Sequence, residues 1–216
     1  MIPINQTFSP EELSFFSTLD SPSKIQKFLD GIPYSDEDIY RCPRQVLNDR
    51  KAHCFDGALF AAAGLRQLGF PPLVLDLLPI PGSDDDHMLA IYKIDGHWGA
   101  IAKSNFVGLR YREPVFRSLR ELVMSYFEDF YNINREKTLL AYTAPLNLKV
   151  FDRYGWMVCD TSMQEIAHRL DKLRRNNLLT PRMQASLALV DERFYQAGLT
   201  GANWEGLYKP TSSQTS

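Results

Sequence analysis

The sequence lacks the features of secreted, membrane-spanning and disulfide-stabilised proteins. It has only three cysteines, Cys42, Cys54 and Cys159, and their odd number and scattered positions argue against a disulfide framework. No apolar run approaches the about 20 residues that span a bilayer. Residues 1–7 have neither the cationic nor the long apolar region of a signal peptide. These absences predict a protein of a reducing compartment, the cytoplasm, with no membrane partner.

An excess of charge of either sign is also missing. The 24 lysines and arginines nearly balance the 26 aspartates and glutamates, and the net charge of −2 disfavours nucleic acid as a partner. The sequence has no CxxC or HxxxH pair of the kind that binds zinc, and no glycine-rich phosphate loop. We therefore expect no metal and no cofactor.

The length and composition predict one globular domain. A chain of 216 residues with 44% hydrophobic and 23% charged residues is ordinary for such a domain. We expect the domain to span residues 1–208, with a helical part at 1–50, a core at 51–116 and a second helical part at 117–208. A polar tail follows at 209–216. Ser9-Pro10, Ser21-Pro22 and Thr180-Pro181 have the form of helix starts.

Residues 51–70 predict a buried central helix. After a charged beginning the segment is almost entirely small or apolar, and Phe55, Leu59, Ala62 and Leu65 recur at helical spacing. Gly69 supplies a stop signal. Cys54 is expected at the N-terminal end of this helix, where unpaired N–H groups and the helix dipole favour a thiolate.

The residues after this helix predict an antiparallel sheet. Residues 72–79 form an apolar run bounded by prolines, and residues 87–94 read as a second strand. Asp95-Gly96 is a strong hairpin signal, so residues 97–105 are expected to return beside 87–94. The fold class is therefore α+β, with a central helix packed on an antiparallel sheet and flanked by further helices.

The later part of the chain predicts additional elements. Residues 111–116 form an extended segment and 117–131 a helix, while 146–151 alternate as a strand does. Thr161 or Ser162 is expected to cap a helix in a capping box with Glu165. The last helix is expected to run from Thr180 through Phe194.

Cys54, His87 and Asn105 come in an order that suits acyl transfer on a thiol. Such chemistry needs a thiolate, an imidazole within hydrogen-bonding reach and a group that orients the imidazole. Cys54 heads the helix, His87 begins a strand, and Asn105 ends the neighbouring strand. The backbone N–H of Cys54 is the expected oxyanion donor, with Gln45 or Asn48 as a further donor.

This layout resembles the transglutaminase-like, papain-related cysteine-hydrolase superfamily, and in particular a bacterial branch of it. The resemblance covers roughly residues 51–105. The run from His53 to Leu59 looks like the cysteine motif of that superfamily, and Leu68-Gly69-Phe70-Pro71 is similar to its helix exit. His87, followed by Asp95-Gly96 and Trp98, looks like its histidine hairpin. The resemblance implies a Cys-His-Asp or Cys-His-Asn triad.

Two features leave the triad open. A two-residue turn at Asp95-Gly96 places Ser104 opposite His87 and turns Asn105 to the other face of the sheet. Asn105 is still the preferred orienter over Ser104, because its carbonyl can accept from an imidazole N–H. Asp56 adds negative charge near Cys54, which would raise the pKa of the thiol unless a protonated His53 offset it.

The sequence therefore predicts a cysteine-dependent amide hydrolase or acyl transferase that works through a thioester. Its substrate would be a peptide, a protein or a small amide. A second hypothesis is a fold relative without turnover that serves as a binding or scaffold module. A third is acyl transfer from a carrier thioester to an amine, in the manner of arylamine N-acetyltransferases.

Overall fold

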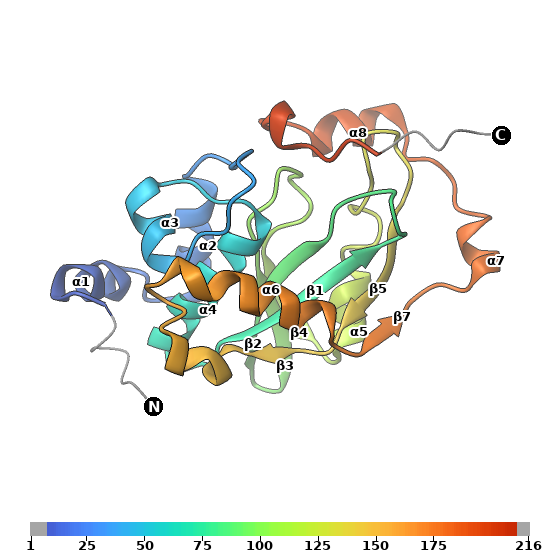
Figure 1. Ribbon diagram of the computed structural model, residues 1–216. Coiled ribbons are helices and arrows are strands. Elements are labelled where there is room, and N and C mark those ends of the chain that lie inside the picture. Colours follow the sequence, from blue (N-terminus) through green and yellow to red (C-terminus); the bar gives the residue numbers. More distant parts are fainter. Residues whose placement is uncertain (1–7, 211–216) are drawn as a thin grey trace.

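A seven-stranded antiparallel sheet organises this protein, with helices on both of its faces (Figure 1). The computed structural model describes residues 8–210. The expectations about residues 1–7 and about the part of the tail beyond residue 210 lie outside the described residues. The predicted α+β class is confirmed, because helices and antiparallel strands both contribute to the structure.

The strands follow the order β4-β3-β2-β1-β5-β7, and β6 also pairs with β1. Their bounds are β1 Leu73–Pro79, β2 His87–Ile94, β3 His97–Ile101, β4 Arg112–Phe116, β5 Leu139–Thr143, β6 Leu146–Asn147 and β7 Arg175–Asn177. Ile94 pairs with His97, which confirms the two-residue turn at Asp95-Gly96. Asp95 and Gly96 both have positive φ, as a tight hairpin of this kind requires.

Eight α-helices and three 3₁₀ segments complete the described part of the chain. The helices are α1 Pro10–Thr18, α2 Pro22–Asp30, α3 Pro43–Asp49, α4 Cys54–Gln67, α5 Leu119–Met124, α6 Met163–Asp171, α7 Pro181–Gln184 and α8 Glu192–Gly198. The 3₁₀ segments are Leu148–Tyr154, Asp160–Ser162 and Trp204–Gly206. No helix within residues 8–210 has the length and apolar character needed to cross a membrane.

Several later predictions need correction. Of the helix expected at 117–131, only α5 is helical. The helix expected from Thr180 through Phe194 is divided into α7 and α8. Most of the strand expected at 146–151 is instead a 3₁₀ segment that follows the short β6. Ser162 precedes α6 as expected but makes no capping hydrogen bond, because its hydroxyl donates to the carbonyl of Cys159.

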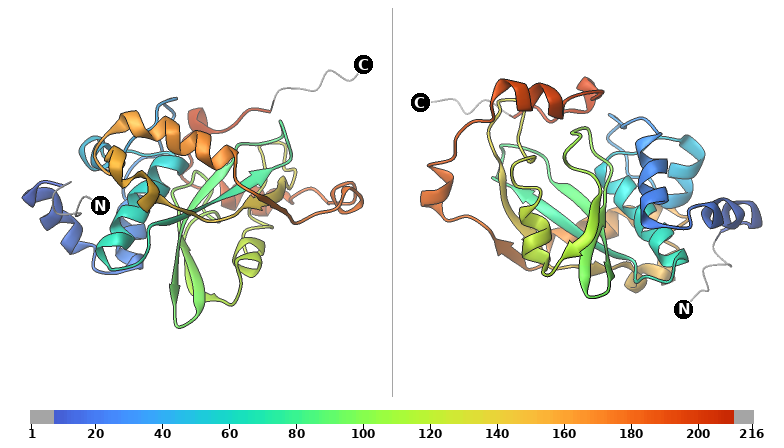
Figure 2. Two further views of the ribbon diagram at one scale, coloured as in Figure 1. Left: turned by 60° about the horizontal axis from the view of Figure 1, so that its bottom comes forward. Right: turned by 180° about the vertical axis from the view of Figure 1, so that it is seen from behind.

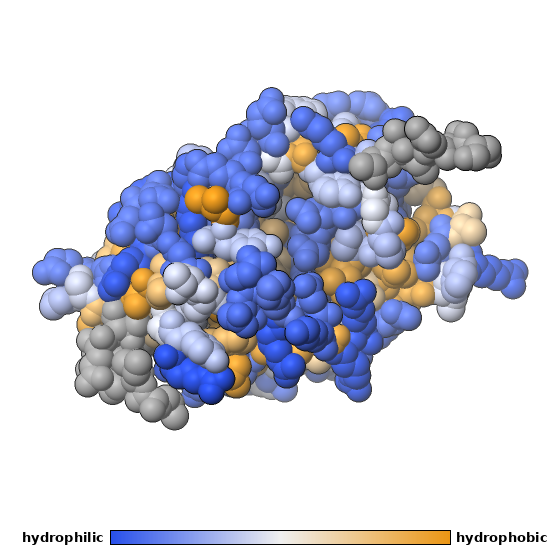
Figure 3. All heavy atoms as spheres, in the orientation of Figure 1, coloured by the Kyte–Doolittle hydropathy of each residue, from blue (hydrophilic) through white to orange (hydrophobic). Residues whose placement is uncertain are grey.

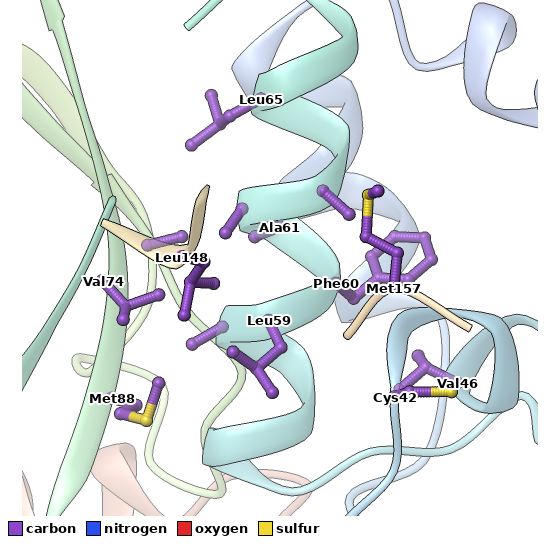
Figure 4. Packing of buried hydrophobic residues seen from close by; sticks show 14 of the residues in the cluster. Cys42, Val46, Leu59, Phe60, Ala61, Leu65, Val74, Met88, Leu148 and Met157 are labelled. Carbon is purple, nitrogen blue, oxygen red and sulfur yellow. The ribbon is translucent and has the colours of Figure 1, made fainter. Parts of the chain in front are cut away.

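Helix α4 is the centre of the larger hydrophobic core. Every residue from Cys54 to Leu65 is buried, as predicted for a helix apolar on nearly all sides. Figure 4 shows Leu59 directed toward the strands that carry Val74 and Met88, and Phe60 on the other side of the helix. The close approach of α4 to the sheet is possible at Gly57, where an added Cβ would lie 2.3 Å from Lys103 Cβ.

The two faces of β2 contact different cores. Met88, Ala90 and Tyr92 belong to the core around α4. Leu89 and Ile91 belong to a second core, which α5 covers with Leu122, Val123 and the following Tyr126. In the left view of Figure 2 the strands separate α5 from the N-terminal helices. Because side chains alternate along a strand, this division also fixes the direction of His87.

Candidate functional site at Cys54

The first turn of α4 holds Cys54 in a locally determined position. His53 is the N-cap, and its Nδ1 accepts the backbone N–H of Phe55 at 3.2 Å. In return, the Asp56 carboxylate accepts the backbone N–H of His53. Because Nδ1 is the acceptor, the Nε2–H of His53 donates to the carbonyl of Ile39 at 3.0 Å. Both ring nitrogens of His53 are therefore used to fix the helix start.

Arg41, which no local sequence pattern marks, forms an ion pair with Asp56. Asp56 is completely buried, and its Oδ1 accepts the backbone N–H of Arg41 at 2.8 Å. The Arg41 guanidinium lies 3.5 Å from Asp56 Oδ2 and also donates to Asp49, Ser35 and Glu37. Burial raises the pKa of Asp56, while His53 and Arg41 oppose that shift. The charge of Asp56 thus belongs to a structural network at the start of α4.

The Cys54 thiol is buried beside the backbone of Asp86 and Met88. Only 7% of the residue is exposed, and Sγ lies 3.8 Å from the backbone oxygen of Asp86, to which the thiol donates. Burial raises the pKa of Cys54 well above its ordinary value, and the charges of Asp86 and Asp85 raise it further. This environment disfavours the thiolate, which is the state that nucleophilic attack requires.

His87 projects away from Cys54. Met88 faces α4, so its neighbour His87 points to the opposite face of β2, toward the second core. There its Nε2–H donates to the carbonyl of Leu109 at 2.8 Å. Burial lowers the pKa of His87 to about 4, so the ring is neutral. Cys54 contacts the strand backbone beside His87, and the imidazole lies beyond that backbone.

Asn105 and Ser104 have other partners. The Asn105 amide donates to the carbonyl of Asn203 at 2.8 Å and accepts the N–H of the same residue at 2.8 Å. Ser104 Oγ accepts the backbone N–H of Phe106 at 3.0 Å. Strand β3 ends at Ile101, so both residues follow the strand. Asn105, Ser104 and His87 line one cavity without a hydrogen bond among them in the described structure.

Neither side-chain candidate for the oxyanion donor lines the cavity at Cys54 in the described structure. Gln45 Nε2 donates to Asp49 at 2.8 Å, and Asn48 is exposed on α3. Tyr34 instead lines the cavity beside Cys54. Burial raises the pKa of the Tyr34 phenol well above its ordinary value, and proximity to Cys54 adds to that shift. No local signal in the sequence singles out Tyr34, because it reaches Cys54 from a loop of a different part of the chain.

Cys54 borders an open cavity of about 520 Å³ between α6, residues 34–40 and the C-terminal segment. Eight carboxylate residues contribute to its lining and no lysine or arginine does: Asp36, Glu37, Asp38, Asp76, Asp85, Asp86, Asp171 and Glu205. Figure 3 shows that the face on which α6 lies is mostly hydrophilic. The cavity is therefore acidic although the whole chain is nearly neutral.

Asp76 is the deepest of these carboxylates. It lies on β1 and is 4% exposed, and its Oδ1 has no hydrogen-bond partner among the described residues. Burial raises the pKa of Asp76 well above its ordinary value, and the charge of Asp86 and a hydrogen bond with the Asp86 carboxyl raise it further. Asp86 has a pKa raised to about 6, first by burial and then by Asp85.

No protein-family model and no curated protein matches the chain. Two solved structures of LapG from Legionella pneumophila resemble it at low identity. The EGTA-treated protein is 13% identical, with 74% of this chain and 92% of the other covered and a TM-score of 0.38. The second structure is 12% identical, with 78% and 91% covered and a TM-score of 0.38. Similarity of this degree establishes neither a shared fold nor a shared activity.

Proposed function

We propose that this protein binds a ligand in the cavity at Cys54 and does not turn it over by thiol chemistry. The observation that carries the proposal is the placement of the Cys54 thiol and the His87 imidazole on opposite sides of β2. A thiol becomes a nucleophile by losing its proton to a base within hydrogen-bonding reach. The Cys54 thiol donates to the backbone carbonyl of Asp86, which cannot take up that proton.

Electrostatics support the same proposal. Asp85 and Asp86 add negative charge around Cys54, so that ionising the thiol there costs more than in water. The helix dipole of α4 favours an anion at this position but contributes only about 0.3–1 kcal/mol. In the described conformation Cys54 is a buried polar side chain on the floor of a cavity.

A cysteine-dependent amide hydrolase or acyl transferase is the second candidate, and the place of Cys54 at the head of α4 on an open cavity favours it. In this mechanism Sγ attacks the acyl carbonyl and its proton passes to His87. The C–N bond then breaks, the amine leaves with the proton, and water or another amine resolves the thioester. The backbone N–H of Cys54 would bind the oxyanion, since the first N–H groups of a helix lack intrahelical acceptors.

His87 already has one attribute of a catalytic base. Its Nε2–H is held by the Leu109 carbonyl, which leaves Nδ1 as the atom able to accept a proton. The Leu109 carbonyl would thus orient the ring, which is the role predicted for Asn105. The second candidate requires the end of β2 to turn His87 toward Cys54. With this second candidate we also propose a transglutaminase-like fold, a single domain over residues 1–208 and a cytoplasmic location.

Thiol alkylation distinguishes the two candidates. We expect Cys54 to react with iodoacetamide slowly, with an apparent pKa above the ordinary thiol value of about 8.5. His87→Gln keeps a donor for the Leu109 carbonyl but removes the base, and it should leave the Cys54 profile unchanged. Peptide mass spectrometry after labelling across a pH series measures each cysteine separately.

Cys159 is the internal control, because it is partly exposed. Labelling at Cys54 with an apparent pKa below about 7, rising in the His87→Gln variant, would establish a thiolate–imidazole pair. That result would contradict the proposed binding function and support the cysteine-dependent hydrolase or acyl transferase. A Cys54 that stays unreactive across the series while Cys159 is labelled would support the binding function.

A further inference from the structure

We infer that Lys103 is a covalent attachment site for a small aldehyde or ketone, which its side-chain amine captures as an imine. This inference is independent of the function proposed for the cavity at Cys54. Lys103 follows β3 and lines a separate cavity of about 380 Å³, between the end of α2, residues 103–110 and residues 200–203. Among the described residues only Tyr34 lines both cavities.

The hydrogen bonds of Lys103 suit an uncharged amine. Its Nζ donates to the carbonyl of Leu29 at 2.8 Å and to the carbonyl of Ile32 at 2.5 Å. An ammonium group has three N–H donors, whereas a neutral amine has two N–H donors and a lone pair. Within residues 8–210 no third group accepts from Nζ. The two carbonyls therefore satisfy the neutral amine completely and leave its lone pair unused.

No carboxylate is paired with Lys103. The residue is only 6% exposed and forms no ion pair in the described part of the chain, although a buried lysine is normally paired. The carboxylate of Asp30 is nearby, but it is already paired with Arg110 at 3.0 Å. Burial lowers the pKa of Lys103 to about 8; Asp30 opposes that shift and Arg110 adds to it. A substantial fraction of the amine is therefore neutral near physiological pH.

A neutral lysine amine is a nucleophile toward carbonyl carbon. The lone pair of Nζ forms a bond to that carbon, and the π electrons of the C=O bond move to its oxygen. The two protons of Nζ and the carbonyl oxygen then leave together as water, and a C=N bond remains. No oxidant or reductant takes part. Ile32 lines the cavity, so water can replace the bond from Nζ to its carbonyl once the imine has formed.

The lining of the cavity suits a small carbonyl compound. A volume of about 380 Å³ is within the range of small-molecule sites. Lys103 is the only lysine among the described residues that line it. Ser104 also lines it, and its Oγ accepts the backbone N–H of Phe106 at 3.0 Å. Because a hydroxyl is both donor and acceptor, Ser104 keeps its own proton to donate to a carbonyl oxygen.

Reductive trapping with propanal tests the inference on the full chain. Sodium cyanoborohydride reduces the imine to a stable secondary amine, and peptide mass spectrometry measures each lysine separately. At about pH 7.5 we expect Lys103 to be labelled at least about tenfold faster than the exposed Lys93, because an ordinary lysine with a pKa of about 10.4 is almost entirely protonated there. The labelling rate of Lys103 should rise with pH around a midpoint of about 8.

Two controls show whether the reactivity comes from the folded site. In urea the cavity is lost, so Lys103 and Lys93 should be labelled at equal rates. Lys137 is the control for burial, because its side chain is 16% exposed and Nζ lies 2.5 Å from Glu128 Oε2. That carboxylate favours the ammonium form, so Lys137 should be labelled more slowly than Lys103 in the folded protein.

Three results would overturn the inference. Labelling of Lys103 no faster than that of Lys93 in the folded protein, or a midpoint above about pH 10, would show that Lys103 is a cation that caps the last carbonyls of α2. A preference for Lys103 that persists in urea would show that the cavity does not cause it. None of these results affects the alkylation experiment, which measures whether Cys54 ionises.

Discussion

Replacing Arg41 by methionine is expected to lower the free energy of unfolding by about 3–5 kcal/mol, because it leaves the charge of Asp56 buried without its cation. Arg41 is 1% exposed and Asp56 is completely buried. Methionine fills much of the space of the arginine side chain but supplies no donor. Two backbone N–H groups would still reach Asp56, from Arg41 and His53, and they satisfy hydrogen bonds without removing the charge.

The effect of Arg41→Met can be assigned by a second substitution. Asp56→Asn in the same chain removes the uncompensated charge and should recover at least about 1 kcal/mol, as expected for residues in one network. Arg110→Met is the control, because Arg110 forms an exposed ion pair with Asp30 at 3.0 Å and should cost less than about 1 kcal/mol. Urea unfolding followed by circular dichroism measures all three. Equal losses for Arg41→Met and Arg110→Met would show that Asp56 does not depend on Arg41.

The second large effect is expected for Gly57→Ala. Alanine normally favours a helix over glycine by about 1 kcal/mol. At this position the added Cβ would lie 2.3 Å from Lys103 Cβ, far inside van der Waals contact. Lys103 cannot move away easily, because its Nζ donates to the carbonyls of Leu29 at 2.8 Å and Ile32 at 2.5 Å. We therefore expect a net loss of about 3 kcal/mol, as for overpacking of a rigid core.

Gly31→Ala provides the comparison for Gly57→Ala. Gly31 has φ of −80°, and its added Cβ would lie 3.5 Å from the nearest atoms, which is ordinary contact. The free energy of unfolding should therefore change by less than about 1 kcal/mol. A stability of Gly57→Ala equal to that of Gly31→Ala would mean that α4 and the end of β3 are farther apart than the structure places them.

The sequence predicts α4 and the hairpin of β2 and β3 well because their signals are local. The apolar residues of α4 repeat at helical spacing, and Asp95-Gly96 supplies the positive φ values that the turn needs. Strands β5 and β7 were not predicted. Strand β7 is only three polar residues long, and its pairing with β5 joins segments distant in the chain, so no local pattern marks it.

The candidate site was predicted less well than the fold. The position of Cys54 at the head of α4 is confirmed, because the small and apolar run that follows it is a local signal. The direction of His87 depends on which face of β2 meets α4, and a shift of one residue would reverse it. Asn105 finds its partner in Asn203, which is 98 residues away. Asp76 appears in the sequence as one polar residue within an apolar strand, and only the fold shows that it is buried and that its carboxyl meets that of Asp86.

The two hydrogen bonds between Asn105 and Asn203 join the end of the chain to the sheet, so the cavity is completed late in synthesis. Asn203 also donates from its side chain to the Tyr34 carbonyl at 3.1 Å, and the residues that follow it, Glu205 to Tyr208, form one wall of the Cys54 cavity. These residues follow β7, the last strand of the sheet, so they are synthesised after every strand. A growing chain could fold α4 and the sheet while the cavity still lacked one side.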